Sequence, residues 1–174
     1  NIYYGLGAIA CGLSCGIEIS QIQEALSNIK GVYRRLEKIY DENYMIIDNN
    51  CSMPSDYNLI FEETQNIKCK DIHVINAIDI DQGIYNIKGN LEVILNWMPI
   101  VGIKKIYFYI DKIDDLIINN IDLLFTSKGA DYEIFTELNT CIENAISLLD
   151  KNDLLLLMGN ECLKESREII SQLI

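Results

Sequence analysis

Two short stretches of the sequence carry side chains that could bind a ligand. Residues 31–37 read G-V-Y-R-R-L-E and place Arg34 beside Arg35, and residues 48–54 read D-N-N-C-S-M-P. Arginine keeps its charge, and its planar guanidinium can form two parallel hydrogen bonds, so the pair suits an anionic ligand. The alternative is that one or both arginines are solvated charges at a strand end, paired with Glu37.

The polar residues of the second stretch, Asn49, Asn50 and Ser52, can donate and accept hydrogen bonds. They precede Pro54, which the first turn of a helix tolerates. They could contact a ligand or cap the loop ahead of that helix, the common role of Asn and Ser. Further along, Asp79 and Asp81 could bind an amine or a cation, or they could belong to a solvated loop.

Composition excludes several functions. The 174 residues include 14 Lys plus Arg and 26 Asp plus Glu, a net charge of −12, which argues against a nucleic-acid or anionic-membrane surface. Six cysteines without a C-x-x-C pair, and one histidine, do not suggest a zinc site. Cys11 and Cys15 share one helix face, and buried free thiols in a reducing cytosol are expected. His73 alternates with Ile72 and Val74 and is expected to be a satisfied strand residue.

No apolar run approaches the ~20 residues of a membrane span, and no signal peptide is visible. We therefore expect a cytoplasmic protein with no membrane partner. The length predicts a single domain, 1–174. The chain begins without Met, inside a helical pattern, so we expect a fragment of a longer chain.

The first part of the chain predicts two helices and a hairpin. Apolar residues recur at helical spacing from Ile2 to Leu13, and Ser20 is expected to cap a second helix that ends at Gly31. Two strands follow, Leu36–Tyr40 and Tyr44–Ile47, joined by a turn at 41–43.

After this the chain alternates between helices and strands. Helices are predicted at 55–66, 89–98, 113–125, 138–149 and 162–173, and strands at Ile72–Ile78, Lys105–Ile110, Tyr132–Phe135 and Leu154–Met158. Such alternation predicts a Rossmann-like α/β fold, a mainly parallel sheet with helices on both faces. We expect at least five parallel strands, with Leu36–Tyr40 as an antiparallel edge strand.

Ligands of such sheets bind beyond the carboxyl ends of the strands. Three polar loops, Asp48–Met53, Asp79–Asn90 and Gly159–Glu161, follow strands directly and should lie along that edge. Arg34 and Arg35 must be close to them.

The order of four motifs resembles a known family. The chain opens with N-I-Y-Y-G-L-G-A-I-A, continues with G-V-Y-R-R-L-E at 31–37 and M-I-I-D-N-N-C-S-M-P at 45–54, and later reads L-L-L-L-M-G-N-E at 154–161. This pattern resembles the C-terminal domain of the Mur ligases, ATP-dependent amide ligases that include folylpolyglutamate synthase. The G-V-x-R-R-x-E form is similar to the branch that adds alanine or a tripeptide to UDP-N-acetylmuramate, which implies peptidoglycan biosynthesis.

The resemblance implies roles for individual residues on the nucleotide side. Arg35 aligns with the arginine that contacts the nucleotide, and Arg34 is its companion. Asn1 matches an asparagine that approaches the adenine, and the loop residues Asn49, Asn50 and Ser52 could touch a ribose or adenine. If Arg35 has this role, its guanidinium should project toward Asn49–Ser52.

On the other side, the resemblance implies that Gly159, Asn160 and Glu161 face the incoming amino acid, where Glu161 could hold an ammonium group. The alternative is a simple strand-to-helix turn, with Glu161 favourable at a helix start. Asp79 and Asp81 fall on the loop that carries amino-acid specificity in relatives.

The chain contains no phosphate-binding loop motif ending in G-K-[ST]. The resemblance implies that ATP and Mg bind in the complete enzyme through a central ATPase domain of the same protein. We therefore expect no cofactor, no metal ligand and no catalytic residue in this domain alone.

Three positions depart from the family pattern. Asn49 stands in place of an aspartate, Ser52 in place of a histidine, and Tyr4 in place of a second asparagine. For this reason we favour capping over ligand contact for Asn49. Two alternatives to a ligase domain remain: a degenerate non-catalytic ligand-binding module, and an α/β interaction domain.

Overall fold

The computed structural model describes residues 2–29 and 31–174. Within them the chain forms two compact units, which meet in the sequence between Tyr33 and Arg34. A single domain spanning 1–174 therefore stays a prediction. None of the helices in these described ranges is long and apolar enough to cross a membrane.

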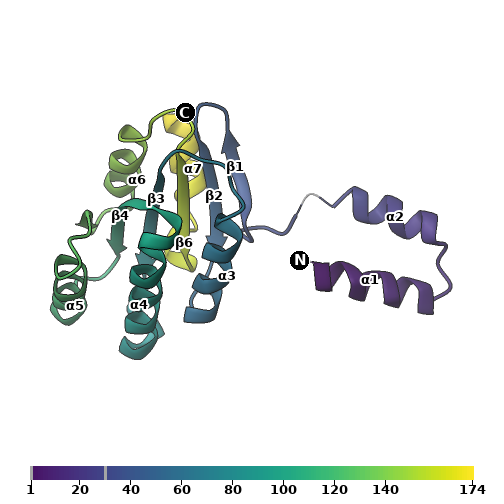
Figure 1. The fold of residues 1–174 in the computed structure, drawn as a ribbon, viewed down its shortest axis with the longest axis horizontal. Coiled ribbons are helices and arrows are strands. Elements are labelled where there is room, and N and C mark those ends of the chain that lie inside the picture. Colours follow the sequence, from purple (N-terminus) through teal and green to yellow (C-terminus); the bar gives the residue numbers. More distant parts are fainter. Residues whose placement is uncertain (1, 30) are drawn as a thin grey trace. The chain divides into compact units, whose positions relative to one another are not determined.

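The first unit is a hairpin of two helices, α1 (Ile2–Ser14) and α2 (Ile19–Ser27) (Figure 1). Gly16 lies between them with φ +76°, a left-handed conformation that glycine adopts at the least cost. Gly12 lets the helices approach closely, because a Cβ atom at this position would lie 2.7 Å from Ile22 Cδ1.

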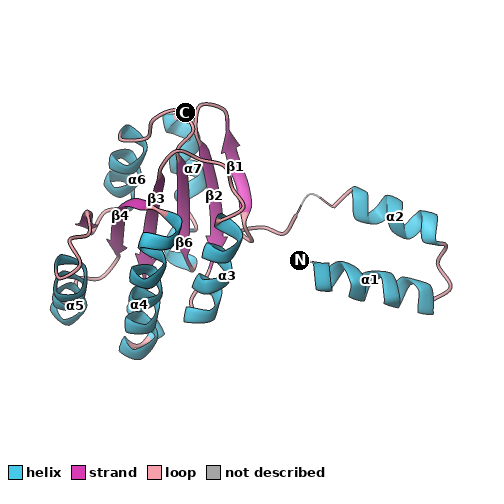
Figure 2. Ribbon diagram, in the orientation of Figure 1, coloured by secondary structure: helices cyan, strands magenta, loops and turns pink. Residues whose placement is uncertain are grey.

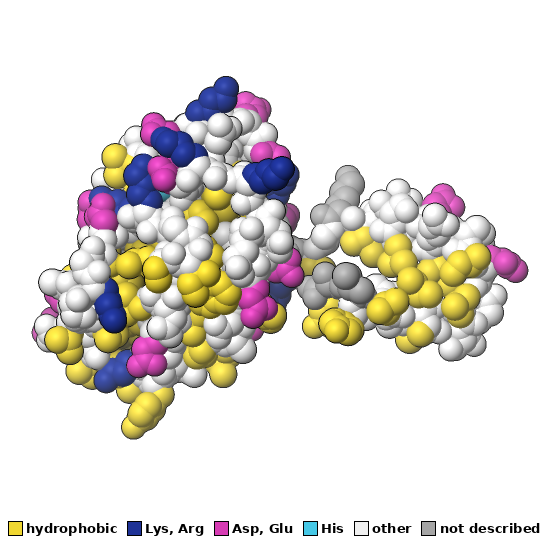
Figure 3. All heavy atoms as spheres, viewed as in Figure 1, with side chains coloured by type: hydrophobic (Ala, Val, Ile, Leu, Met, Phe, Trp, Pro, Cys, Tyr) yellow, Lys and Arg dark blue, Asp and Glu magenta, His cyan; other side chains and the backbone are white. Residues whose placement is uncertain are grey.

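Two predictions for this unit are wrong. Ser20 is not a cap, because α2 already begins at Ile19 and the extended residue before it is Glu18. Cys11 and Cys15 are exposed rather than buried. Large apolar side chains are exposed as well, among them Tyr3, Tyr4, Leu6 and Leu13. Figure 3 shows apolar side chains along the hairpin.

The second unit contains a six-stranded sheet in the order β1-β2-β6-β3-β4-β5 (Figure 2). The strands are β1 (Glu37–Asp41), β2 (Met45–Asn50), β3 (Ile72–Ile78), β4 (Ile103–Ile110), β5 (Tyr132–Phe135) and β6 (Leu154–Gly159). Edge strand β1 runs antiparallel to β2, and the other pairs are parallel. The predicted α/β fold with one antiparallel edge strand is confirmed.

Helices cover both faces of this sheet. One face packs against α3 (Pro54–Thr64), α4 (Ile84–Val101) and α5 (Asp115–Thr126), and the other against α6 (Leu138–Ser147) and α7 (Ser166–Leu173). Successive side chains of β6 alternate between the two cores, and every residue of β6 is buried. A strand covered on both faces is apolar throughout, which explains the run L-L-L-L-M.

The predicted polar loop Asp79–Asn90 is wrong, because most of it is helical. A short 3₁₀ helix, η1 (Ile80–Gln82), is followed by Gly83 with φ +78° and then by α4, five residues before the predicted helix start at 89. The buried residues Ile87 and Leu91 lie on one face of α4 and hold this early part of the helix on the core.

His73 is buried in β3 at the opposite, amino end of the sheet. Its Nδ1 atom lies 3.2 Å from the Tyr107 hydroxyl, whereas Nε2 lies 3.8 Å from Asp153 Oδ2 and has no hydrogen-bond partner among the described residues. The expectation of a fully satisfied histidine is therefore wrong for this nitrogen. Burial lowers the pKa of His73, and the nearby Asp153 carboxylate only partly opposes this.

Stability should consequently fall in mild acid. Because the pKa of His73 in the folded chain lies below its ordinary value of 6.5, the unfolded chain binds the proton more readily once the pH drops below about that value. We expect the free energy of unfolding to decrease from pH 7 to pH 5, and less so in His73→Gln. Urea unfolding of both proteins across this range measures it; parallel pH profiles would contradict the linkage.

Candidate functional site

The candidate site lies at the carboxyl ends of β2, β6 and β3, which are neighbours in the sheet. Asn50 at the end of β2 pairs with Gly159 at the end of β6. Gly159 fits tightly, because a Cβ atom there would lie 2.8 Å from Ala77 Cβ and 3.2 Å from the Ala77 carbonyl oxygen of β3. The segments that follow β2, β3 and β6 therefore meet at one edge, although much of the predicted loops is strand or helix.

The segment that carries the two arginines turns sharply before β1. Arg34 and Leu36 have left-handed backbone angles, φ +52° and +50°, which are strained for residues with a Cβ atom. Hydrogen bonds hold the turn: Arg34 N donates to Glu37 Oε2 (2.8 Å), and Leu36 N donates to Asn49 Oδ1 (2.8 Å). The turn directs the two neighbouring arginines to different environments.

Arg34 is buried, with 2% of its surface exposed. Its Nε lies 3.1 Å from both carboxylate oxygens of Asp48, Nη1 donates to the Asn160 carbonyl (2.7 Å) and Nη2 to the Gly159 carbonyl (3.0 Å). One guanidinium thus joins β2 to the loop after β6. Because protein groups take its donors and cover it, Arg34 presents no surface to a phosphate in this conformation.

Arg167, from the first turn of α7, completes this charge network, and the sequence analysis missed it. Its Nε donates to Asp48 Oδ2 (3.3 Å), Nη1 donates to Glu37 Oε1 (3.2 Å), and Nη2 binds Glu37 Oε2. The hydrogen bonds from Arg167, helped by the Arg34 main chain, lower the pKa of Glu37. No local sequence pattern links positions 37 and 167. The two residues meet because β6, which precedes α7 in the chain, pairs with β2 inside the sheet.

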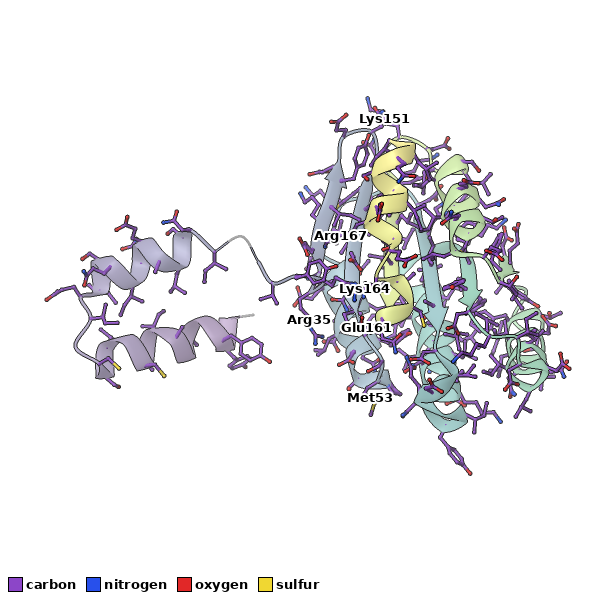
Figure 4. All side chains as sticks on the ribbon, turned by 180° about the vertical axis from the view of Figure 1, so that it is seen from behind. Arg35, Met53, Lys151, Glu161, Lys164 and Arg167 are labelled. Atoms are coloured by element: carbon purple, nitrogen blue, oxygen red, sulfur yellow. The ribbon has the colours of Figure 1, made fainter. Side chains whose placement is uncertain are left out.

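Arg35 is exposed, and Nη1 donates to the main-chain carbonyl of Asn50 (3.0 Å). Its guanidinium therefore projects toward the end of β2, as expected. Figure 4 shows Arg35, Glu161 and Lys164 at the same end of the sheet, with Arg167 further along. The predicted pairing of Arg34 or Arg35 side chains with Glu37 is not observed, because Glu37 binds Arg167 and the Arg34 main chain.

Residues of the predicted loop Asp48–Met53 form hydrogen bonds with other groups of the protein. Asp48, Asn49 and Asn50 belong to the strand itself, and Asn49 (6% exposed) donates through Nδ2 to the Asn50 carbonyl (3.2 Å). Capping of α3 by Asn49 or Ser52 is wrong: the Asp56 carboxylate accepts the N–H groups of Ser52 and Met53. Asn1 lies outside the described residues.

On the other side of the site, Asp79 and Asn160 join β3 to β6. Asn160 Nδ2 donates to Asp79 Oδ2 (2.6 Å), and Asp79 Oδ1 accepts the Asp81 N–H (2.9 Å). Asp81 and Glu161 are exposed. Of the predicted amine-side residues, three are therefore buried or bonded within the protein (Asp79, Gly159 and Asn160), and two carboxylates face solvent.

The cysteines nearest the site are not nucleophiles at neutral pH. Burial raises the pKa of Cys51 to about 12 and that of Cys162 to about 11, so both stay protonated. Among the described residues, no group of three or more His, Cys, Asp or Glu side chains is placed to hold a metal ion. The chain's own chemistry at this edge is hydrogen bonding and charge.

This sheet with its arginine-bearing edge has the fold of the C-terminal domain of ATP-dependent amide ligases, the Mur ligases and folylpolyglutamate synthases. The structure is similar to the UDP-N-acetylmuramate–alanine ligase MurC of Thermotoga maritima (TM-score 0.73, 16% identity, 99% of this chain and 37% of that one). It is also similar to a type C pseudomurein peptide ligase of Methanothermus fervidus (TM-score 0.71, 23% identity, 100% of this chain and 36% of that one).

Sequence comparison points the same way. The chain is 32% identical over 66 residues to a UDP-N-acetylmuramate–L-alanine ligase of Brachyspira hyodysenteriae, covering 38% of this chain and 14% of that protein. It is 23% identical over 164 residues to a UDP-N-acetylmuramoyl-L-alanyl-D-glutamate–2,6-diaminopimelate ligase of Oceanobacillus iheyensis, covering 91% of this chain and 32% of that protein.

A comparison with protein-family profiles found no match. The chain nevertheless has homologues among the Mur ligases by sequence and by structure. It spans about a third or less of their length. Two similar structures, MurF of Thermotoga maritima and FolC of E. coli, were crystallised with ADP, which supports the use of ATP by the relatives.

Proposed function

We propose that this chain is the C-terminal domain of an ATP-dependent ligase that joins a carboxylate to an amine. It would bind the incoming amino acid or amine and close over ATP held by a central domain of the same protein. The proposal depends on one observation, which we call the Arg34 clamp: the buried Arg34 guanidinium fixes the end of β2 and the Gly159–Asn160 loop to each other. Arg35 stays exposed beside them.

The proposed chemistry needs charge neutralisation. ATP transfers its terminal phosphoryl group to the substrate carboxylate, which gives an acyl phosphate and ADP. The amine then attacks the acyl carbon, an amide bond forms and phosphate leaves. Arg35 is the group in this chain that would face the phosphates, because it is exposed and, within the described residues, is anchored through the bond from Nη1 to the Asn50 carbonyl. A guanidinium fixed before the reaction stabilises the developing charge without reorganisation.

The amine side would be formed by the exposed carboxylates of Asp81 and Glu161. Both belong to short turns that Asn160 ties together: its side chain binds Asp79, and its carbonyl binds Arg34. Asp79, Asn160 and Arg34 are therefore proposed as positioning residues. In this proposal Asn49 and Asn50 hold the arginine turn through their contacts with Leu36 and Arg35, and Ser52 belongs to the loop before α3.

The rest of the proposed enzyme lies outside this chain. Magnesium would be held with ATP by the central domain, since the described residues offer no metal-binding cluster. The exposed apolar side chains of α1 and α2 suit contact with that domain. We propose peptidoglycan synthesis as the process, because the names of the relatives contain UDP-N-acetylmuramate and its peptide derivative, and we propose a cytoplasmic location with it. A degenerate, non-catalytic module is the second candidate, favoured by Asn49, Ser52 and Tyr4.

The test uses the complete protein. It should release ADP only when both a carboxylate substrate and an amino-acid acceptor are present, and screening amino acids against UDP-N-acetylmuramate derivatives would identify them. Amide formation without ATP consumption would overturn the ATP-dependent mechanism, and the absence of amide with any acceptor despite bound ATP would favour the non-catalytic module.

Purified alone, residues 1–174 should not hydrolyse ATP and should bind nucleotide at most weakly. The chain has no phosphate-loop motif, and its net charge of −12 repels ATP. A coupled ADP-release assay, with the complete protein as the positive control, measures this. Turnover that scales with the protein and survives repurification would refute the prediction.

A further inference from the structure

A small polar cavity lies beside the candidate site, between β3, α3, η1 and α4. Its volume is about 10 Å³, and it is lined by Tyr57, Asn76, Ala77, Ile78, Gln82, Ile87 and Asn90. Tyr57 and Asn76 are each 1% exposed and Asn90 is 3% exposed. The Tyr57 hydroxyl donates to Asn76 Oδ1 (2.6 Å), so part of the lining is already paired. The rest of the polar lining comes from Gln82 and Asn90.

Hydrogen bonds fix the orientation of both amides. Asn90 Nδ2 donates to the Ser52 carbonyl (3.0 Å), and because a carbonyl only accepts, the nitrogen must face it. The same nitrogen lies 3.4 Å from Gln82 Oε1, so a flipped Gln82 would set two donors against each other. One donor, Gln82 Nε2, and one acceptor, Asn90 Oδ1, remain buried without a protein partner in the described chain.

We propose that this cavity is a binding site for a single water molecule, which accepts from Gln82 Nε2 and donates to Asn90 Oδ1. The volume fits, since one water needs roughly 10–15 Å³ and two to four polar partners. The Tyr57 hydroxyl, whose proton goes to Asn76, also lines the cavity. An ammonium or metal cation does not fit, because it would face the NH₂ group of Gln82.

The water and Asn90 together join the loop before α3, at Ser52, to η1. The turn formed by Asp79 and η1 is also held by the Asp79–Asn160 bond, by the packing of Ile80 on the core and by the bond from Asn86 Nδ2 to the Gln82 carbonyl (3.1 Å). Asn90 is thus a positioning residue for η1, and this inference does not depend on the proposed ligase function.

A crystal structure of the chain at about 1.5 Å or better tests the site directly. An ordered water should lie roughly 2.7–3.2 Å from both Gln82 Nε2 and Asn90 Oδ1. A direct hydrogen bond between Gln82 Nε2 and Asn90 Oδ1, or a cavity without density, would overturn the proposal.

Hydrogen exchange tests the positioning role in solution. Asn90→Leu keeps the approximate size of the side chain but removes both polar atoms. We expect the amides of Asp81, Gln82 and Gly83 to exchange about tenfold faster, the loss expected for one or two hydrogen bonds, while the amides of β4 stay near their original rates. Asn120→Leu, at a half-buried position of α5, is the matched control.

Gln82→Met carries the same test if Asn90→Leu fails to fold, because Gln82 is only half-buried. The positioning role is wrong if the three η1 amides change no more than in the control, or if β4 accelerates equally.

Discussion

Replacing Arg34 by methionine should destabilise the chain by about 3–5 kcal/mol, the cost of leaving a buried carboxylate without its main partner. Asp48 is 0% exposed, and the weaker contact to Arg167 at 3.3 Å is what remains to it. The carbonyls of Gly159 and Asn160 lose donors at the same time. Urea unfolding of the chain, monitored by circular dichroism, measures the change.

The paired variant Arg34→Met/Asp48→Leu separates the lost ion pair from lost packing. Because it removes both charges, it should recover a large part of the loss, since an apolar pair can replace a buried ion pair without much cost. Lys38→Ala is the matched control, because Lys38 is an exposed cation paired with Asp41 and its loss should cost ~0–1 kcal/mol. An Arg34→Met variant as stable as this control would show that the clamp is not structural.

Arg35→Ala should act on turnover instead. Under the proposed function, kcat of the complete protein should fall roughly 30- to 1000-fold, or ~2–4 kcal/mol, because the proposed charge-assisted contact to the phosphates would be lost in a closed site. The melting temperature should stay within the range of the Lys38→Ala control, since Arg35 is exposed and makes one main-chain contact. Arg35→Lys should recover only part of the rate, because an ammonium cannot form the bidentate contact.

Steady-state kinetics and melting curves of these variants decide between two roles. Unchanged turnover in Arg35→Ala would reduce Arg35 to an ordinary charge at a strand end. A large loss of stability in this variant would show instead that both arginines belong to the fold.

The sheet was predictable because its signals are local. The buried strand Leu154–Met158 is a continuous apolar run and Ile72–Ile78 is mostly apolar. Both lie between helical segments, and alternation of this kind permits few topologies. The start of α4 could not be predicted, because the polar residues Asn86, Lys88 and Asn90 in its first turns are also typical of a loop. Asn90 is polar and yet buried, since its partner is a main-chain carbonyl 38 positions away.

The different environments of the two arginines could not be predicted from the sequence. In the sequence Arg34 and Arg35 are equivalent neighbours, and the left-handed backbone at Arg34 and Leu36 decides which one is buried. That conformation is held by contacts with Glu37 and Asn49 and by the ends of β2 and β6, none of which follows from residue spacing. Arg167 was missed for the same reason.

The strand order has a consequence for synthesis. β2 and β3 do not pair with each other, because β6, the last of the six strands along the chain, lies between them. The chain must therefore leave the ribosome as far as Gly159 before β6 can insert between β2 and β3. Until then β2 and β3 each have one edge without a paired strand. Nascent or truncated chains that lack β6 should rely on chaperones and aggregate readily, since unpaired apolar strand edges recruit other chains.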